Sequence, residues 1–188
     1  MHDGELVSDE DLQSVRMEPL APHDGPVVLS RYDPTWPRLY QREAARLRAL
    51  LGDQVVSLDH AGSTSVPGLA AKPIIDIVLT VPNSADEAAY VPTLTAAGYR
   101  LVIRESDWFE HRLMKGPDTD INLHVFSSGE AEVARMLRFR DRLRTQPSER
   151  DLYARTKRSL ARRRWRHVQH YAQAKSGIVQ EILDRADQ

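Results

Sequence analysis

Three residues of this sequence have types and positions that are common in ligand-binding or catalytic sites. Gly62 and Ser63 come directly after a predicted strand, and Asp76 lies inside a second, strongly β-branched one, PIIDIVLTV. Glycine at a strand end lets a ligand approach the backbone, and a serine hydroxyl with nearby N–H groups binds phosphate oxygens. A buried carboxylate needs a charged partner, and magnesium on a ligand's phosphates is a suitable one. We therefore predict a phosphate site with Ser63 and Asp76 as its catalytic residues.

Cationic side chains are predicted to surround this site. Lysine is rare beside arginine in the chain, which indicates that it is kept where a compact ammonium is needed. Arg140, Lys157 and Lys175 each fall on the apolar stripe of a predicted helix. Such cations usually reach solvent from the edge of a core, but three in succession indicate convergence on an anion. The predicted phosphate ligands are Gly62, Ser63, Thr64, Ser65, Lys72, Lys115, Arg140, Lys157 and Lys175.

Local signals place these residues on a mixed set of strands and helices. Asp33 and Gly52 bound a predicted helix, because aspartate followed by prolines starts a helix and glycine ends one. The run 73–81 is predicted to be a central strand, since it is apolar on both faces. The other predicted strands are 27–30, 54–61, 99–104, 108–114 and 120–127, and the other predicted helices are 84–97, 130–145, 148–164 and 165–186.

Composition indicates a globular protein of one domain. The chain has 188 residues, of which 41% are hydrophobic and 28% charged, and its net charge is −1. It has no cysteine, no secretory signal and no run of about 20 apolar residues. We therefore expect a cytoplasmic protein without a membrane partner. Residues 1–26 are acidic and aperiodic, which predicts a disordered or loosely attached tail. One domain is predicted at 27–188, with a sheet part, 27–129, and a helical part, 130–188.

Longer stretches of the chain resemble one protein family. YDPTWPRLYQREAARLRALLG, DHAGSTSVPGLAAKPIIDI, HRLMKG, NLHVF, FRDRLR and the spacings Tyr153-xxx-Lys157 and Tyr171-xxx-Lys175 look like the GrpB family, from about residue 27 to the C-terminus. The resemblance implies an α/β fold of the α+β type, with a nucleotidyltransferase-like mixed β-sheet, flanking helices and a C-terminal helical region. In that superfamily the Gly-Ser turn holds phosphates and strand carboxylates hold magnesium. Some relatives are fused to a dephospho-coenzyme A kinase, which points to nucleotide or coenzyme metabolism.

The acidic positions of the chain depart from that superfamily, which usually has Asp-x-Asp or Asp-x-Glu on the first strand. Val78 stands at the second acidic position here. A third acid usually comes from a later strand, and on the matching strand Asp120, Asn122 and His124 share one face. Asp120 lies near the end of that strand and is less well placed. The predicted metal ligands, for magnesium, are Asp76, Asn122 and His124.

Histidines offer a second metal hypothesis. His60, His111 and His124 are predicted to lie around the glycine–serine loop. Each of them alone is better explained as a partly buried, hydrogen-bonded histidine. A zinc site needs its ligands at about 2.0–2.1 Å from one ion, a convergence that sequence does not reveal. Zinc therefore ranks below magnesium.

Three functions stay open on these residues. The first is a magnesium-dependent nucleotidyltransferase, in which Gly62 and Ser63 hold phosphates and Asp76 holds the metal; the missing second acid counts against it. The second is a catalytically inactive protein that binds a nucleotide or another phosphate-bearing small molecule. The third is an RNA-binding module built on the arginine-rich run 162–166. A solvated helix face is the preferred explanation of that run, so nucleic acid is not expected as a partner.

Overall fold

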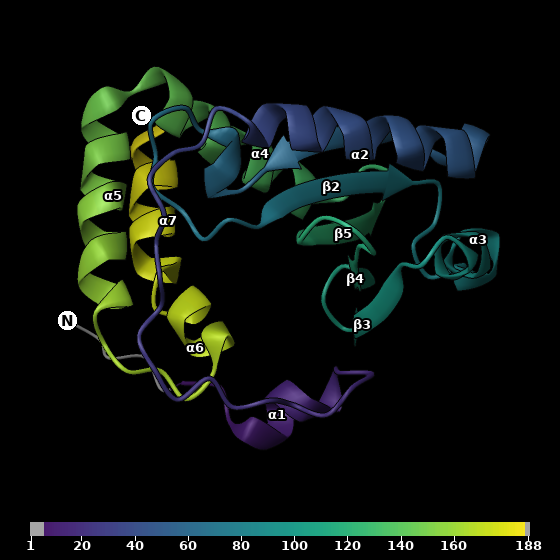
Figure 1. The fold of residues 1–188 in the computed structure, drawn as a ribbon, viewed down its shortest axis with the longest axis horizontal. Helices are drawn as coiled ribbons and strands as arrows, with labels where there is room; N and C mark the ends of the chain where they lie inside the picture. The colour runs from purple at the N-terminus through teal and green to yellow at the C-terminus, as the bar shows by residue number, and fades with distance from the viewer. Residues whose placement is uncertain (1–5, 187–188) are drawn as a thin grey trace.

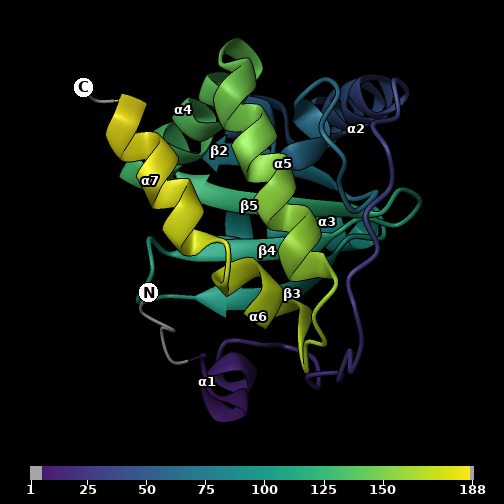
Figure 2. The ribbon, with the colours of Figure 1, turned by 90° about the vertical axis from the view of Figure 1, so that its left-hand side faces the viewer.

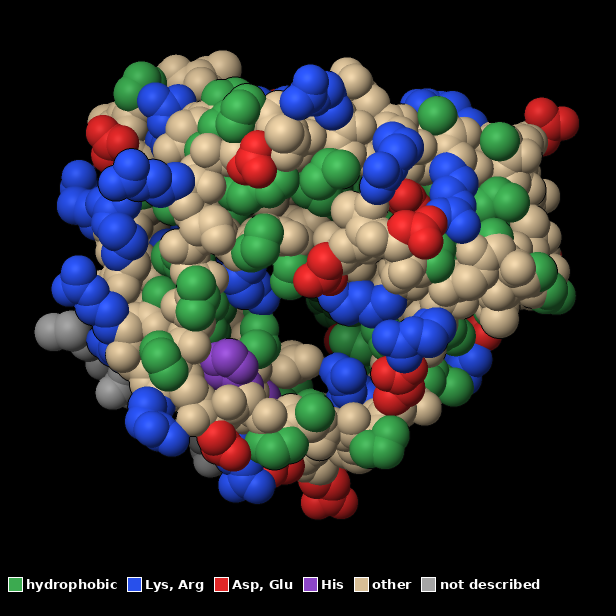
Figure 3. Space-filling view, in the orientation of Figure 1, with side chains coloured by type: hydrophobic (Ala, Val, Ile, Leu, Met, Phe, Trp, Pro, Cys, Tyr) green, Lys and Arg blue, Asp and Glu red, His purple; other side chains and the backbone are tan. Residues whose placement is uncertain are grey.

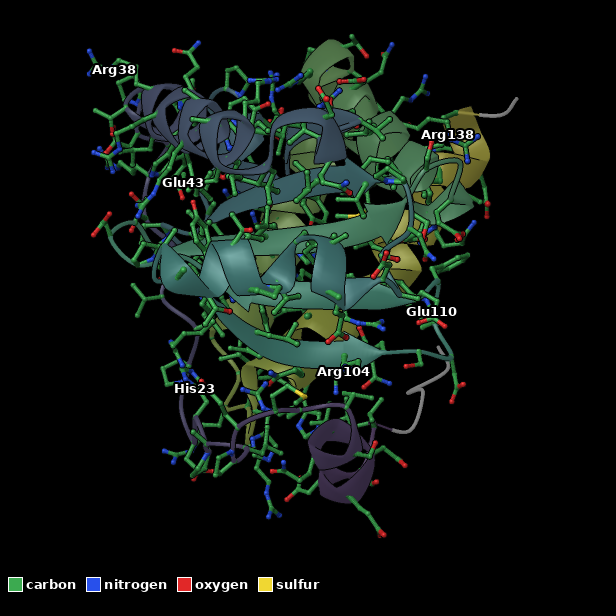
Figure 4. All side chains as sticks on the ribbon, turned by 90° about the vertical axis from the view of Figure 1, so that its right-hand side faces the viewer. His23, Arg38, Glu43, Arg104, Glu110 and Arg138 are labelled. Carbon is green, nitrogen blue, oxygen red and sulfur yellow. The ribbon has the colours of Figure 1, made fainter. Side chains whose placement is uncertain are left out.

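The computed structural model describes residues 6–186, which form a five-stranded mixed sheet with helices on both faces. The strand order is β1-β2-β5-β4-β3, and β2 and β5 are the parallel pair at its centre. Figure 2 shows α4–α7 in front of the sheet, whereas the opposite view in Figure 4 shows α3 in front. The predicted fold class, a mixed α/β sheet with flanking helices and a C-terminal helical region, is confirmed.

The strands and helices have the following bounds. The strands are β1 (Ser57–Ala61), β2 (Ile75–Val81), β3 (Arg100–Glu105), β4 (His111–Lys115) and β5 (Ile121–Ser127). The helices are α1 (Asp9–Ser14), α2 (Trp36–Leu51), α3 (Val91–Ala96), α4 (Ala131–Thr145), α5 (Pro147–Ala161), α6 (Val168–Gln173) and α7 (Ser176–Ala186) (Figure 1). Short 3-10 turns are η1 (Gly52–Gln54), η2 (Ser63–Ser65) and η3 (Glu87–Ala89).

The central strand β2 separates two cores. Ile75, Ile77 and Leu79 are fully buried against α2 and α3, in the larger core of the protein. Residues of a strand alternate between faces, so Asp76 and Val78 point to the other side, where α4 packs. The parallel register sets Asp76 beside Asn122 and Val78 beside His124, which places all four on the α4 side. This register brings the predicted site residues of two strands together.

Helix α2 contributes one polar contact to the larger core. Glu43 is 2% exposed and points from α2 toward the sheet (Figure 4). The hydroxyl of Tyr99 donates a hydrogen bond to its carboxylate. Burial and this bond raise the pKa of Tyr99 above its usual value. The buried pair is therefore satisfied internally and is unconnected with the site described below.

Three predicted elements differ in the structure. The helix predicted at 84–97 is only Val91–Ala96, because Pro92 lacks an N–H and fits only the first turn of a helix. The strand predicted at 27–30 is a single bridge from Ser30 to Ala71, since the N–H of Val27 donates instead to the end of α5. The helix predicted at 165–186 is divided into α6 and α7.

The acidic tail is ordered over its described residues. Ser8 caps α1 by accepting a hydrogen bond from the N–H of Asp11 at 3.1 Å. The next segment pairs with the edge strand β3, where the N–H of Arg104 donates to Val15 O at 2.8 Å. Residues 6–26 are thus attached to the rest of the chain through backbone partners that composition does not reveal, because an exposed strand edge supplies them. Residues 1–5 lie outside the described residues.

The helices of the described chain are too short or too polar to cross a membrane.

Candidate functional site

A cavity of about 250 Å³ lies between the sheet and helices α5 and α6. Its floor comes from the glycine–serine turn after β1 and from the first residues of β2 and β5. Its other side comes from α4, α5, α6 and Lys175, which lies between α6 and α7. Figure 3 shows the surface hollowed between the helical region and the sheet, with lysine or arginine side chains beside the opening. The predicted residues that line the cavity are Gly62, Ser63, Thr64, Lys72, Asp76, Asn122, His124, Lys157 and Lys175.

Gly62 allows the turn to lie directly on Asp76. Its φ is 62°, a value that side chains rarely permit, and a Cβ atom there would lie 2.1 Å from Asp76 Oδ2. The hydroxyl of Ser65 donates to Gly62 O at 2.6 Å, and the hydroxyl of Thr64 donates to Ile74 O at 3.1 Å. The hydroxyls of the predicted phosphate ligands Thr64 and Ser65 therefore brace the turn through backbone oxygens.

Lys157 joins helix α5 to this turn. Its Nζ donates to Ser63 Oγ at 2.7 Å and to Ala70 O at 2.6 Å. The side chain is only 2% exposed. Burial, together with the positive charges of Lys175 and Lys72, lowers the pKa of Lys157 to about 7. A buried amine in this state gains strongly from any anion that enters the cavity.

Two more lysines line the same space. Burial lowers the pKa of Lys72 and of Lys175, and the charge of Lys175 lowers that of Lys72 further. Lys175 Nζ lies 4.6 Å from the centre of the Tyr171 ring. Tyr171 also lines the cavity and is 1% exposed, and its hydroxyl has no hydrogen-bond partner within residues 6–186. Tyr171 therefore contributes its ring, with Lys175 against it, to the lining of the cavity.

Asp76 is the one acidic side chain in the described lining of the cavity. Asn122 Nδ2 donates to its Oδ1 at 2.7 Å, and His124 Nε2 lies 3.8 Å from the same atom. Burial would raise the pKa of Asp76, but the neighbouring His124 ring, the Asn122 amide and the charge of Lys72 together lower it. Asp76 is therefore an ionised acceptor facing an excess of cations.

The donor set around Asp76 does not match magnesium. Among residues 6–186 there is no group of three or more His, Asp or Glu side chains that could hold a metal ion. Magnesium prefers oxygen ligands in an octahedron, but Asn122 turns its amide nitrogen to Asp76 and His124 offers nitrogen. Val78, at the second acidic position, is fully buried with Ala61 and Phe126. The structure brings the three predicted ligands together without a second carboxylate.

Three predicted phosphate ligands, Ser65, Lys115 and Arg140, lie outside the lining. Lys115 Nζ pairs with Asp120 Oδ1 at 3.1 Å on the exposed end of the β4–β5 turn. Arg140 pairs with Asp141 at 2.7 Å and donates to His60 O at 3.1 Å. Arg140 thus holds α4 against the end of β1, and its charge is already compensated.

Three residues of the arginine-rich run 162–166 contact other parts of the chain. Trp165 is 7% exposed and its indole N–H donates to Leu160 O at 2.8 Å, so its ring is not free to stack on a base. Arg164 donates to Asp24 O at 2.8 Å, and Arg166 pairs with Asp9. Arg164 and Arg166 therefore hold the N-terminal segment.

Sequence reasoning missed Tyr153 and Tyr171 as site residues, although a signal for them was present. Each tyrosine stands four residues before a cavity lysine, and residues four apart share one face of a helix. Tyr153 is hydrogen-bonded with Ser63, and its burial raises its pKa to about 12. The repeated Tyr-xxx-Lys spacing therefore marks one turn of α5 and the segment from α6 to Lys175, each of which brings a lysine to the cavity.

A family model described as GrpB protein matches residues 26–185. UPF0157 protein BH1888 of Halalkalibacterium halodurans is 62% identical over 180 residues, which cover 96% of this chain and 92% of that protein. The crystal structure of conserved protein GrpB from Enterococcus faecalis superposes with a TM-score of 0.73 at 28% identity, covering 86% of this chain and 100% of that one.

A longer relative shares the same region. A protein of Mycolicibacterium paratuberculosis named dephospho-CoA kinase is 30% identical over 187 residues, which cover 86% of this chain and 46% of that protein. More than half of that relative therefore lies outside the match.

Proposed function

We infer that this chain, which belongs to the GrpB family, binds the phosphate group of a nucleotide or of another phosphate-bearing small molecule in the cavity between the sheet and helices α5 and α6. One observation carries the proposal. Lys72, Lys157 and Lys175 line the cavity together with Asp76, the one acidic side chain of its described lining. The cavity is therefore built to receive an anion.

The energetics of buried lysines support this proposal. An ammonium taken out of water without a partner is costly, and the lowered pKa values of all three lysines express that cost. A phosphate group offsets the cost because its oxygens accept charge-assisted hydrogen bonds from several ammonium groups at once. The hydroxyl of Ser63 is an additional donor in the same lining. Gly62, which has no side chain, leaves the backbone open to close approach.

The lysines also provide the positive charge that magnesium provides in a metal-dependent phosphate site. We therefore expect binding without a divalent cation. Magnesium-dependent nucleotidyl transfer, with Asp76, Asn122 and His124 as ligands, remains the alternative. It requires the ion to find its other ligands among substrate oxygens and water, because the described lining offers one carboxylate.

Thermal unfolding with a set of phosphate compounds tests the proposal. Suitable probes are inorganic phosphate, AMP, ATP and dephospho-coenzyme A. The last is chosen because a relative named dephospho-CoA kinase shares this region. A compound at about one hundred times its Kd should stabilise the protein by about 2.7 kcal/mol, which raises Tm by roughly 5–10 °C for a chain of this length. The measurement is made once with EDTA and once with magnesium.

Lys175→Met and Lys115→Met form a matched pair for this experiment. Methionine keeps the length of the lysine stem but removes the charge. Lys175→Met should lose most of the stabilisation by the ligand, whereas Lys115→Met should keep it, because Lys115 pairs with Asp120 outside the cavity. Equal loss in both variants, or no stabilisation by any of the compounds, contradicts the proposal. Stabilisation that needs magnesium favours the metal-dependent alternative.

A further inference from the structure

A second pocket, of about 360 Å³, adjoins the glycine–serine turn. Gly62, Ser63 and Thr64 line the cavity, whereas Ser65 lines the second pocket, and no residue belongs to both linings. The same turn therefore borders two separate spaces, of which the proposed phosphate binding uses one.

Three segments that are distant in the sequence meet at the second pocket. The stretch 32–41, which leads into α2, contributes two tyrosines, and the loop after the turn contributes Pro67. Arg144 comes from the last turn of α4 and Arg150 from the first turns of α5. None of these side chains lines the cavity, so the proposed phosphate binding leaves them without a role.

The described lining of the second pocket is positively charged. It contains two arginines, Arg144 and Arg150, and no acidic side chain. Arg150 forms no ion pair within residues 6–186. Arg144 lies 3.3 Å from Asp141, but that carboxylate also pairs with Arg140 at 2.7 Å. Burial and the charge of Arg140 lower the pKa of Arg144, which indicates that positive charge is in excess here.

The two arginines differ in what they already bind. Nε and Nη2 of Arg144 donate to Ser65 O at 3.0 and 2.9 Å, so this side chain also supports the turn. The guanidinium of Arg150 has no hydrogen bond to the described chain. Arg150 is therefore the group that a ligand can pair with without breaking a contact of the fold.

Flat, fixed side chains form the walls of this pocket. The ring of Tyr40 stacks on that of His60 with centres 4.8 Å apart, and its hydroxyl donates to Leu58 O at 2.8 Å. Tyr32 packs edge-on against Trp36 at 5.4 Å. Two prolines complete the apolar part of the lining. Such walls suit a planar apolar group, because rings held in place lose little freedom when a ligand packs on them.

The two spaces differ in the kind of cation that they present. The described lining of the cavity has three lysines and no arginine, whereas that of the second pocket has two arginines and no lysine. An ammonium is a compact point charge, but a guanidinium is a planar fork that matches the two oxygens of a carboxylate. The second pocket therefore suits a planar anion beside a planar apolar group.

We propose that the second pocket is an anion-binding site for a carboxylate attached to a flat apolar group. The carboxylate pairs with Arg150 beside Arg144, and the flat group packs on the rings of Tyr32 and Tyr40. The site is separate from the cavity, so both can be occupied at once. The proposal does not depend on phosphate binding.

Calorimetric titration with benzoate, acetate and benzenesulfonate tests the site and its ligand class. Benzoate should bind about tenfold more tightly than acetate, which lacks the flat group. Benzenesulfonate keeps the ring and the charge but replaces the planar anion by a tetrahedral one, and should bind more weakly than benzoate. Equal binding of benzoate and benzenesulfonate overturns the carboxylate as the preferred anion, and equal binding of benzoate and acetate overturns the role of the flat walls.

Arg150→Met and Arg155→Met form the matched pair of variants. Arg155 is exposed on the same helix and does not line the pocket. Arg150→Met should weaken benzoate binding about tenfold, because a charge-assisted hydrogen bond is lost, whereas Arg155→Met should leave it unchanged. Equal affinities in the two variants, or no binding of benzoate by the wild type, overturn the site.

A second comparison separates this site from the cavity. Lys175→Met should weaken binding of inorganic phosphate and leave benzoate unaffected, and Arg150→Met should do the reverse. If benzoate is displaced by saturating phosphate or lost in Lys175→Met, benzoate occupies the cavity and the second site is overturned. If phosphate does not bind but benzoate binds through Arg150, phosphate binding fails while the second site stands.

Discussion

Replacing Gly62 with alanine should abolish phosphate binding and lower the free energy of unfolding by about 3 kcal/mol. The backbone at Gly62 has φ 62° and ψ −171°, a region that is essentially restricted to glycine. An added Cβ would also lie 2.1 Å from Asp76 Oδ2, so either the turn or the carboxylate must move. Each movement shifts Ser63 or Asp76, which both line the cavity. Urea unfolding and calorimetric titration with inorganic phosphate measure the two effects.

Gly68→Ala is the control for the backbone part of this effect. Gly68 also has a positive φ, of 79°, but no atom lies within 4 Å of its virtual Cβ. It should lose stability from the unfavourable φ alone and keep its affinity for phosphate. If Gly62→Ala binds phosphate as Gly68→Ala does, close contact between the turn and Asp76 is not needed for binding.

The strands that carry the site could be predicted because their residue patterns are typical of β-strands. The run around Asp76 is β-branched and apolar on both faces, as a central strand requires, and it became β2 (Ile75–Val81). Strand β5 alternates, so that Asn122 and His124 were expected on one face, where they lie. The tail could not be predicted in this way, because its order depends on backbone groups of β3 and on the arginines after α5.

The cationic side of the cavity was only partly predictable. Helical periodicity showed that Lys157, Lys175 and Arg140 face inward, which the structure bears out, but periodicity does not say what each charge meets. Arg140 meets Asp141 and Asp59, whereas the two lysines meet no carboxylate at hydrogen-bonding distance among the described residues. Which inward cation stays available for a ligand is thus decided by the packing of helices on the sheet.

The second pocket was beyond the reach of sequence. His60 was expected near the glycine–serine loop, but Tyr40 and Arg150 were not connected with it. Their meeting depends on how α2, α4 and α5 pack around the turn. That packing is not encoded in the periodicity of one helix.

The free energy of unfolding of the ligand-free protein should rise between pH 7 and pH 9, by about 2–3 kcal/mol from Lys157 alone. Burial and the neighbouring lysines lower the pKa of Lys157 from 10.5 to about 7. Between these two values the unfolded chain binds more protons than the folded one, so raising the pH favours the folded state. Below pH 7 the buried ammonium destabilises the fold to its full extent. Urea unfolding at several pH values measures the slope.

Lys157→Met should remove most of this slope, whereas Lys115→Met should leave it unchanged. Burial in the empty cavity favours the neutral amine of Lys157. A bound anion should instead favour the ammonium form, because a negative charge in the cavity raises the pKa of Lys157. Sulfate, which does not titrate in this range, should therefore bind with uptake of a proton, and its affinity should fall by up to tenfold for each pH unit above about 7. Calorimetry in two buffers of different ionisation enthalpy measures that proton. If Lys157→Met and the wild type have the same slope, Lys157 is charged in the folded protein throughout this pH range. The positive charge of the empty cavity then does not change with the protonation of Lys157.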